Sequence, residues 1–216
     1  MSLCIVIPMK DPLLSKQRLS QVLAPNQRQS VAINLLHKTL AFLSRHFADI
    51  DILVVTPCQS IAAIAKGYQA AVLLEEPAQG LNHAVSSAAQ HCTHLGYDSM
   101  LILPADIITL NLAEFSQLVS APRAAQSIVI CASQDGGSNA LISSPPDVIT
   151  FSYGRNSANL HLESARQQGI SCLQLSLPEL AIDLDTATDL AQLSAGHIAQ
   201  LTRSMTSPSL SKANLI

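Results

Sequence analysis

Short, almost wholly apolar runs recur along the chain and must be buried in any fold that it adopts. They occupy residues 3–8, 51–56, 100–103 and 128–131. A run that is apolar without alternation indicates a strand that is buried on both faces. Segments with helical periodicity, such as 25–47, lie between these runs. The pattern predicts an α/β fold with a mostly parallel central sheet and helices on both faces.

The length of 216 residues is enough for one domain with a full core. A hydrophobic share of 48% against 12% charged residues is typical of such a well-buried aliphatic protein. We therefore expect a single domain over residues 1–202. Residues 203–216 are Ser-rich and without pattern, and we expect them to form a disordered C-terminal tail.

Charge and cysteine usage argue against several classes of protein. A net charge of -3 without a cluster of Lys and Arg predicts no binding to nucleic acid. The N-terminal apolar run is too short for a signal peptide or a membrane span, and we expect no membrane association. Five cysteines, widely spaced and without a Cys-x-x-Cys pair, are typical of reduced thiols in the cytoplasm.

A basic loop follows the first apolar run. Lys10, Lys16 and Arg18 all lie within the segment that succeeds Pro8. Open α/β sheets usually bind ligands at the carboxyl ends of their strands, so these cations are candidates for contact with an anionic ligand. The alternative is a solvated loop whose basic side chains bind nothing.

Three aspartates follow strand-like segments. Asp106 comes just after the run 100–103, while Asp183 and Asp185 alternate on an extended segment, so that their side chains share a face. Carboxylates at the mouth of a sheet can hold a divalent cation that is bound to phosphates. A cap on the next turn would also explain Asp106, whereas the capped helix that starts at Thr186 does not explain the acidic pair.

Two glycine-containing turns have the composition of a cradle for a phosphate. The first joins a Gly-Gly pair to Ser138, and the second places Gly154 just before Ser157, at the predicted start of a helix over 158–168. Glycines let backbone N–H groups approach a ligand, and a helix start presents free N–H groups to an anion. Tight turns use the same residue types, so turn chemistry alone is the alternative. His161, on that helix, is either a ligand contact or a core histidine.

Several motifs occur in order along the chain and together resemble one family. They are Lys16-Gln17-Arg18-Leu19, Gly80-Leu81-Asn82, Pro104-Ala105-Asp106, Gly137-Ser138-Asn139-Ala140-Leu141, Tyr153-Gly154-Arg155-Asn156-Ser157 with His161, and Asp183-Leu184-Asp185-Thr186 with Asp189. This set resembles the 2-phospho-L-lactate guanylyltransferase family, which also contains phosphoenolpyruvate and 3-phospho-D-glycerate guanylyltransferases. The resemblance extends to about residue 193 and implies that the single domain has a GT-A-like nucleotidyltransferase fold.

The resemblance also implies an activity and a set of residue roles. Members of the family use GTP and a small phosphorylated acid, release pyrophosphate and form an intermediate of coenzyme F-420. By this resemblance Lys16, Arg18 and Asp106 are expected to be catalytic. The other expected roles are acid binding by Ser138, Gly154 and Ser157, nucleotide binding by Lys10, Gly80 and Asn82, and Mg²⁺ binding by Asp106, Asp183 and Asp185.

The sequence departs from the family pattern at a few positions, which leaves the identity of the acid open. Ser138 stands where Thr is common, Ile108 where Pro is usual, and Ala158 where an aromatic residue is frequent. Two other classes share the fold: a glycosyltransferase, which would use a sugar nucleotide, and a non-catalytic domain that binds GTP. The presence of all three aspartates argues against the second. The oligomeric state is also open, a homodimer included.

Overall fold

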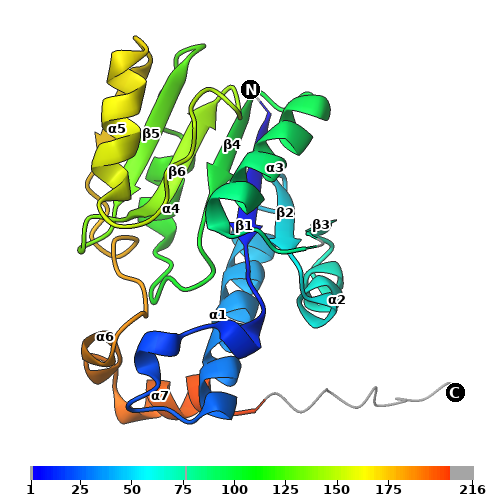
Figure 1. Cartoon of the computed structure of the whole chain (residues 1–216), viewed down its shortest axis with the longest axis vertical. Coiled ribbons are helices and arrows are strands. Elements are labelled where there is room, and N and C mark those ends of the chain that lie inside the picture. Colours follow the sequence, from blue (N-terminus) through cyan, green and yellow to red (C-terminus); the bar gives the residue numbers. More distant parts are fainter. Residues whose placement is uncertain (1, 76, 205–216) are drawn as a thin grey trace, which may run out of the picture.

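The computed structural model describes residues 2–75 and 77–204, and seven strands of this part form one sheet (Figure 1). The strands are β1 (Leu3–Pro8), β2 (Asp51–Thr56), β3 (Ala71–Leu74), β4 (Ser99–Ile102), β5 (Ser127–Ala132), β6 (Ser138–Ser144) and β7 (Ser171–Leu175). Their order across the sheet is β3-β2-β1-β4-β6-β5-β7. Strands from the N-terminal and C-terminal halves of the chain therefore hydrogen-bond within a single sheet.

Neighbouring strands run parallel except where β6 is involved. In the centre of the sheet, Val6 of β1 lies opposite Leu53 of β2 on one side and Ile102 of β4 on the other. β6 runs antiparallel to both β4 and β5. The predicted mostly parallel α/β fold is confirmed. Because β6 runs the other way, its first residues, Ser138 and Asn139, lie at the edge where the parallel strands end.

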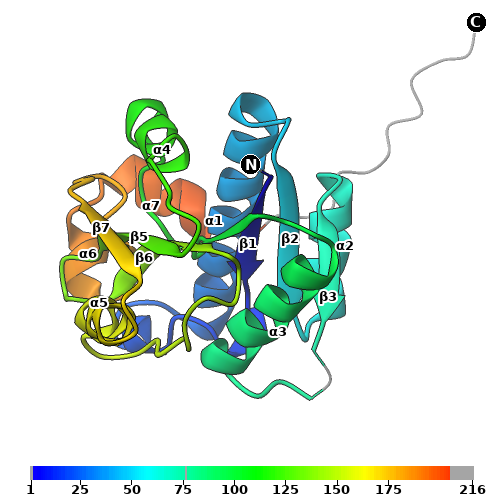
Figure 2. The ribbon, with the colours of Figure 1, turned by 90° about the horizontal axis from the view of Figure 1, so that it is seen from above.

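Helices cover both faces of the sheet, as predicted. They are α1 (Pro25–His46), α2 (Gln59–Gly67), α3 (Leu81–His94), α4 (Leu112–Val119), α5 (Ser157–Gln167), α6 (Ala187–Ala191) and α7 (Ala195–Thr202). Figure 2 shows α1 and α4 on one face and α3 and α5 on the other. Side chains of β1 alternate between two buried clusters, with Ile5 and Ile7 facing α1, and Cys4 and Val6 facing α3.

A third, smaller apolar cluster lies at the carboxyl edge of the sheet. It joins the loop after β1, the start of α1 and the segment before α6, and its buried members are Leu19, Leu23, Val31, Leu35, Leu184 and Leu190. Figure 1 shows α6, α7 and the N-terminal loop gathered at this end of the molecule. The cluster therefore ties the basic loop to the segment that carries Asp183 and Asp185.

Sequence reasoning missed two helices and placed one strand start wrongly. α4 and α7 were not predicted, although both begin with a visible cap: Asn111 accepts hydrogen bonds from the N–H groups of Ala113 and Glu114, and Ser194 accepts one from His197. The sequence also predicts a loop up to residue 140, whereas β6 begins at Ser138, because this residue pairs with the end of β5.

The end of the described chain is held to α1. The side-chain amide of Asn34 donates to the carbonyl of Arg203 at 3.0 Å. Residues 205–216 lie outside the described residues, so the disordered tail stays a prediction. Among the described residues, no helix combines the length and the hydropathy that crossing a membrane requires.

Candidate active site

The three aspartates predicted as metal ligands lie together: Asp106, Asp183 and Asp185. One carboxylate oxygen of each lies within 4.8 Å of those of the other two. A short antiparallel pairing between 106–108 and 182–184 brings them together, and in it the Leu184 N–H donates to the Asp106 carbonyl at 3.0 Å. Two distant parts of the chain thus supply one acidic cluster at the carboxyl edge of the sheet.

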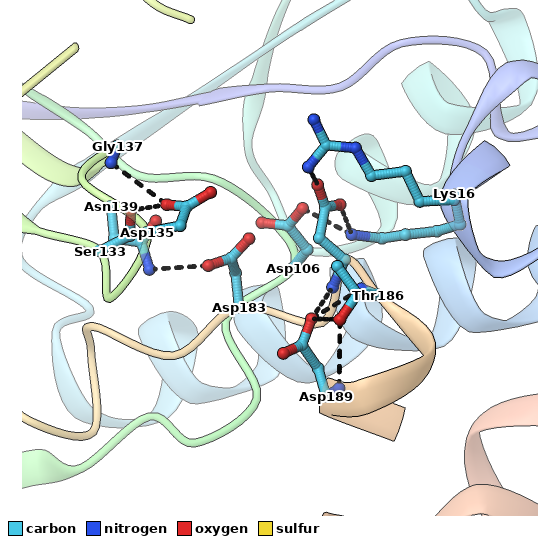
Figure 3. Close-up of polar contacts among 11 residues, drawn as sticks. Lys16, Asp106, Ser133, Asp135, Gly137, Asn139, Asp183, Thr186 and Asp189 are labelled. Carbon is cyan, nitrogen blue, oxygen red and sulfur yellow. Dashed lines mark hydrogen bonds and ion pairs between the residues drawn. The ribbon is translucent and has the colours of Figure 1, made fainter. Parts of the chain in front are cut away.

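The ammonium group of Lys16 lies within this cluster. Its Nζ donates to Asp106 Oδ2 at 2.6 Å and to Asp185 Oδ1 at 3.2 Å, and the side chain is 6% exposed (Figure 3). Lys16 has a φ of 54°, a left-handed conformation that costs energy for a residue with a side chain. Arg18 also contacts Asp185, at 3.3 Å, but 68% of its side chain is exposed. Of the two predicted catalytic cations, Lys16 is therefore the one that is built into the site.

Opposing effects act on the pKa values of this cluster. Burial by itself lowers the pKa of the Lys16 ammonium, but the charges of Asp106 and Asp185 outweigh it, and the pKa is raised. Burial, followed by the charge of Asp106, raises the pKa of the Asp183 carboxyl above its ordinary value. The site thus favours a charged Lys16 and disfavours a third negative charge in the absence of another cation.

A pocket of about 370 Å³ opens beside the acidic cluster and is within the size range of ligand sites. It lies where β1 and β4 end, the edge at which open α/β sheets bind ligands. The predicted site residues in its lining are Lys10, Lys16, Gly80, Asp106, Ser138, Asp183 and Asp185. The other four are outside the lining: Arg18 contacts Asp185 of the cluster, Asn82 and Ser157 contact the lining residues Tyr153 and Ser138, and Gly154 contacts Ser157.

Asn82 braces a wall of the pocket. Its Oδ1 accepts a hydrogen bond from the Tyr153 N–H at 2.6 Å, and its Nδ2 donates to the Tyr153 carbonyl at 3.2 Å. Tyr153 itself lines the pocket. The structure therefore places Asn82 at the junction between α3 and the loop before α5, and its predicted nucleotide contact stays a prediction.

Ser138 and Ser157 meet, as the expected acid site requires. Their hydroxyl oxygens are 3.0 Å apart, and the Ser138 oxygen is also 3.0 Å from Nδ1 of His161. All three residues are buried, and Ser138 lines the pocket. Gly154 is exposed and has a φ of 138°, a conformation that favours glycine.

The predicted cradle of free backbone N–H groups is wrong at four of its positions, because these N–H groups are hydrogen-bonded within the protein. The Gly136 N–H donates to the Ser133 carbonyl, and the Gly137 N–H donates to the Asp135 carboxylate. At the start of α5, the Ser157 N–H donates to the Gly154 carbonyl, and the Ala158 N–H donates to that of Gly136. These four N–H groups are satisfied within the turns, and the residues of the motif that line the pocket are Ser138 and Asn139.

Sequence reasoning missed the residues that hold the acids in place. Asn139, which is 6% exposed, donates through Nδ2 to Asp183 Oδ1 at 3.3 Å (Figure 3). The same nitrogen donates to the Leu180 carbonyl at 3.1 Å. Glu114 of α4 accepts hydrogen bonds from the N–H groups of Glu179 and Leu180, at 2.9 to 3.1 Å. Asn139 lies within one of the family motifs, but its partner could not be found from local pattern.

The fold and the site define a class of protein. This mostly parallel sheet, with three carboxylates and a buried lysine at its carboxyl edge, has a fold that is found in a solved nucleotidyltransferase. A nucleotidyl transferase from Methanothermobacter thermautotrophicus has the same fold: the TM-score is 0.66, over 92% of this chain and 98% of that one, at 13% identity.

Sequence comparison identifies the family. The family described as guanylyl transferase, CofC like, matches residues 3–200, and the chain belongs to it. It is 42% identical to a 3-phospho-D-glycerate guanylyltransferase of Colwellia psychrerythraea, over 88% of this chain and 90% of the relative. It is 32% identical to a phosphoenolpyruvate guanylyltransferase of Rubrobacter xylanophilus, over 90% and 95%. A 2-phospho-L-lactate guanylyltransferase of M. thermautotrophicus is 29% identical, over 89% and 84%.

Proposed function

We propose that this protein transfers GMP from GTP to a small phosphorylated acid and releases pyrophosphate, as a step in coenzyme F-420 biosynthesis. 3-Phospho-D-glycerate is the first candidate acid, because the relative that is 42% identical carries that name. The observation that carries the proposal is the position of Lys16 and the three aspartates beside a pocket that also contains Ser138.

The residues of the pocket fit a bound Mg²⁺. The lining contains four carboxylates, of Glu75 and the three aspartates, against the ammonium groups of Lys10 and Lys16. A triphosphate would be repelled by this balance unless a cation came with it. Oxygen ligands of an octahedral Mg²⁺ lie about 3 to 4 Å apart, given bonds of about 2.1 Å. The 4.8 Å limit within which the three carboxylate oxygens fall is close to that spacing. We propose that Asp106, Asp183 and Asp185 hold the ion.

The transfer needs positioning and charge neutralisation more than covalent help. A phosphate oxygen of the acid forms a bond to the α-phosphorus of GTP, and the bond from that phosphorus to the oxygen bridging the α- and β-phosphates breaks. Pyrophosphate leaves with the electron pair of that bond. Lys16 would neutralise charge on the phosphates as they approach, with Arg18 at the rim. Mg²⁺, when bound, supplies further neutralisation of the leaving pyrophosphate.

Binding roles divide between two walls of the pocket. Lys10 and Gly80 lie in the lining on the β1 and α3 side and are proposed to contact GTP, while Asn82 shapes that wall through Tyr153. Ser138 lies in the lining on the β6 side, with Ser157 against it. Ser138 is proposed to contact the acid, with Ser157 supporting it from behind and Gly154 in the adjoining turn.

A coupled pyrophosphate-release assay tests the proposal. Purified protein is incubated with Mg²⁺, with GTP, ATP, CTP or UTP, and with each of the three phosphorylated acids. We expect release only with GTP and an acid together, and loss of at least about a hundredfold in Asp106→Asn. Release without an acid, or transfer from a sugar nucleotide instead, would show that the proposed function is wrong.

A further inference from the structure

Both ring nitrogens of His161 are engaged by the protein. His161 lies on α5 and is fully buried. Its Nε2 is 2.8 Å from the backbone nitrogen of Ser152, and its Nδ1 is 3.0 Å from the Ser138 hydroxyl oxygen. The ring packs edge-on against Tyr153, with centroids 5.0 Å apart. His161 is outside the pocket lining, and its one side-chain hydrogen bond to a lining residue is to Ser138.

The contact with Ser152 decides which nitrogen carries the proton. A backbone N–H can only donate, so Nε2 must accept and cannot be protonated. Burial lowers the pKa of His161 to about 4, so the ring is neutral near pH 7. A neutral imidazole has one N–H, and here it must be on Nδ1. The Nδ1–H therefore donates to the Ser138 oxygen.

This tautomer leaves the Ser138 proton for the pocket. A hydroxyl has two acceptor lone pairs and one proton. His161 occupies one lone pair, and the Ser157 hydroxyl, 3.0 Å away and outside the pocket lining, can occupy the other. The remaining capacity of Ser138 is then its O–H donor. Carboxylate and phosphate oxygens are acceptors only, so a donor is what a phosphorylated acid requires at this position.

We propose that His161 is a positioning residue that fixes the Ser138 hydroxyl as a hydrogen-bond donor to an anionic oxygen of the phosphorylated acid. This inference rests on the proposed function for the identity of the ligand. It differs from a merely structural role, in which His161 fills space below the pocket and any substitution acts through stability alone.

Two substitutions separate these roles, because each keeps one of the two hydrogen bonds. In His161→Asn the side-chain amide nitrogen would overlie Nδ1, so this variant retains the donor to Ser138 and loses the acceptor for Ser152. The longer side chain of His161→Gln reaches toward Ser152 and loses the donor to Ser138. Each variant gives up one buried hydrogen bond, so we expect comparable losses of stability.

The kinetic arm uses 3-phospho-D-glycerate as the varied substrate at saturating GTP. We expect KM for the acid within about threefold of wild type in His161→Asn, and about tenfold or more higher in His161→Gln, since a bond to a charged group is lost. KM for GTP should be unchanged in both. Equal KM values for the acid in the two variants would overturn the inference.

A spectroscopic arm does not depend on turnover. Long-range ¹H–¹⁵N correlation of the histidine rings in the full-length protein should show His161 as a neutral ring protonated at Nδ1 between pH 6 and pH 8. A ring protonated at Nε2 would overturn the inference even if guanylyl transfer is observed. Conversely, a wild type that transfers GMP to none of the three acids would refute the proposed function, while the Nδ1–H tautomer would still establish the direction of the Ser138 bond.

Discussion

At the scale of single residues, burial and charge pairing give side chains of this site properties that differ from those in water. His161 and Lys16 are both nearly inaccessible, yet one is held neutral and the other charged. The difference follows from their partners. His161 contacts an uncharged backbone N–H and a hydroxyl, whereas Lys16 contacts two carboxylates.

His161 should make stability depend on pH on the acidic side. Its pKa is about 4 in the folded protein and about 6.5 when unfolded, so between these values the unfolded chain binds a proton that the folded protein does not. The stabilisation is complete above pH 6.5 and is lost as the pH falls toward 4. The shift corresponds to about 3 kcal/mol at most. Urea unfolding of wild type and His161→Asn across this range should give free energies that converge by this amount as the pH falls. Parallel profiles would contradict it.

Lys16 should compete with a metal ion for the carboxylates. Its ammonium donates to Asp106 Oδ2 at 2.6 Å, and a cation on the same oxygen would be repelled by the ammonium charge. Lys16→Met should therefore raise the affinity for Mn²⁺ in the absence of nucleotide by about tenfold, while turnover with GTP falls.

Arg18→Met is the matched control for Lys16→Met. Arg18 pairs with the same Asp185 but is 68% exposed, and an exposed ion pair contributes little. Its metal affinity should stay close to that of wild type. Electron paramagnetic resonance during titration with Mn²⁺ measures the metal affinity of the two variants. A weaker affinity in Lys16→Met than in wild type would mean that Lys16 helps to build the metal site.

At the scale of elements, the parts that could be predicted are those whose pattern is local. β1, β2 and β4 each have a continuous apolar centre, and that pattern identifies them. β6 begins with Ser138 and Asn139, two polar residues that are typical of a loop. The structure nevertheless includes Ser138 in the strand, because it pairs with Ala132 of β5. The short pairing of 106–108 with 182–184 could not be predicted, because a backbone contact between distant segments leaves no periodic trace in the sequence.

Glu114 of α4 anchors the segment that leads to the acidic cluster. Its carboxylate accepts three hydrogen bonds from N–H groups of the segment that leads to Asp183. Glu114→Ala should cost about 2 to 3 kcal/mol of folding free energy, because the partly buried N–H groups of Glu179 and Leu180 lose this acceptor. It should also weaken metal binding, since Asp183 loses its support.

Asn111→Ala provides the comparison for Glu114→Ala. It removes only the cap of the same helix and should cost about 1 kcal/mol. Metal affinity should not change. Urea unfolding and Mn²⁺ titration of the two variants test this pair of outcomes. If both variants lose metal affinity in proportion to their stability, Glu114 acts only through the helix.

At the scale of the whole molecule, the site depends on an apolar cluster that is separate from the two sheet cores. Leu184 is fully buried in this third cluster and lies between Asp183 and Asp185. Leu184→Ala should cost about 2 to 5 kcal/mol and should also loosen the acidic pair. The rise in Tm on adding Mg²⁺ and GTP should therefore be smaller than in wild type.

Leu43→Ala removes an equally buried leucine from the main core under α1. Its loss of stability should be comparable, with a rise in Tm on ligand addition that matches wild type. Thermal unfolding of wild type, Leu184→Ala and Leu43→Ala, with and without Mg²⁺ and GTP, measures these rises in Tm. Equal ligand-induced shifts in both variants would mean that the third cluster supports folding and not the site.

The position of β6 between β4 and β5 has a consequence for the growing chain during synthesis. β1, β2, β3 and β4 are neighbours in space and can pair as soon as they have been made. β5 has no partner until β6 and β7 follow it, and Asp183 and Asp185 emerge later still. A nascent chain therefore carries Lys16 and Asp106 for about a third of its synthesis, from residue 106 to residue 183, without the other two acids. The cluster of Lys16 and the three aspartates is therefore complete only when nearly the whole domain has been synthesised.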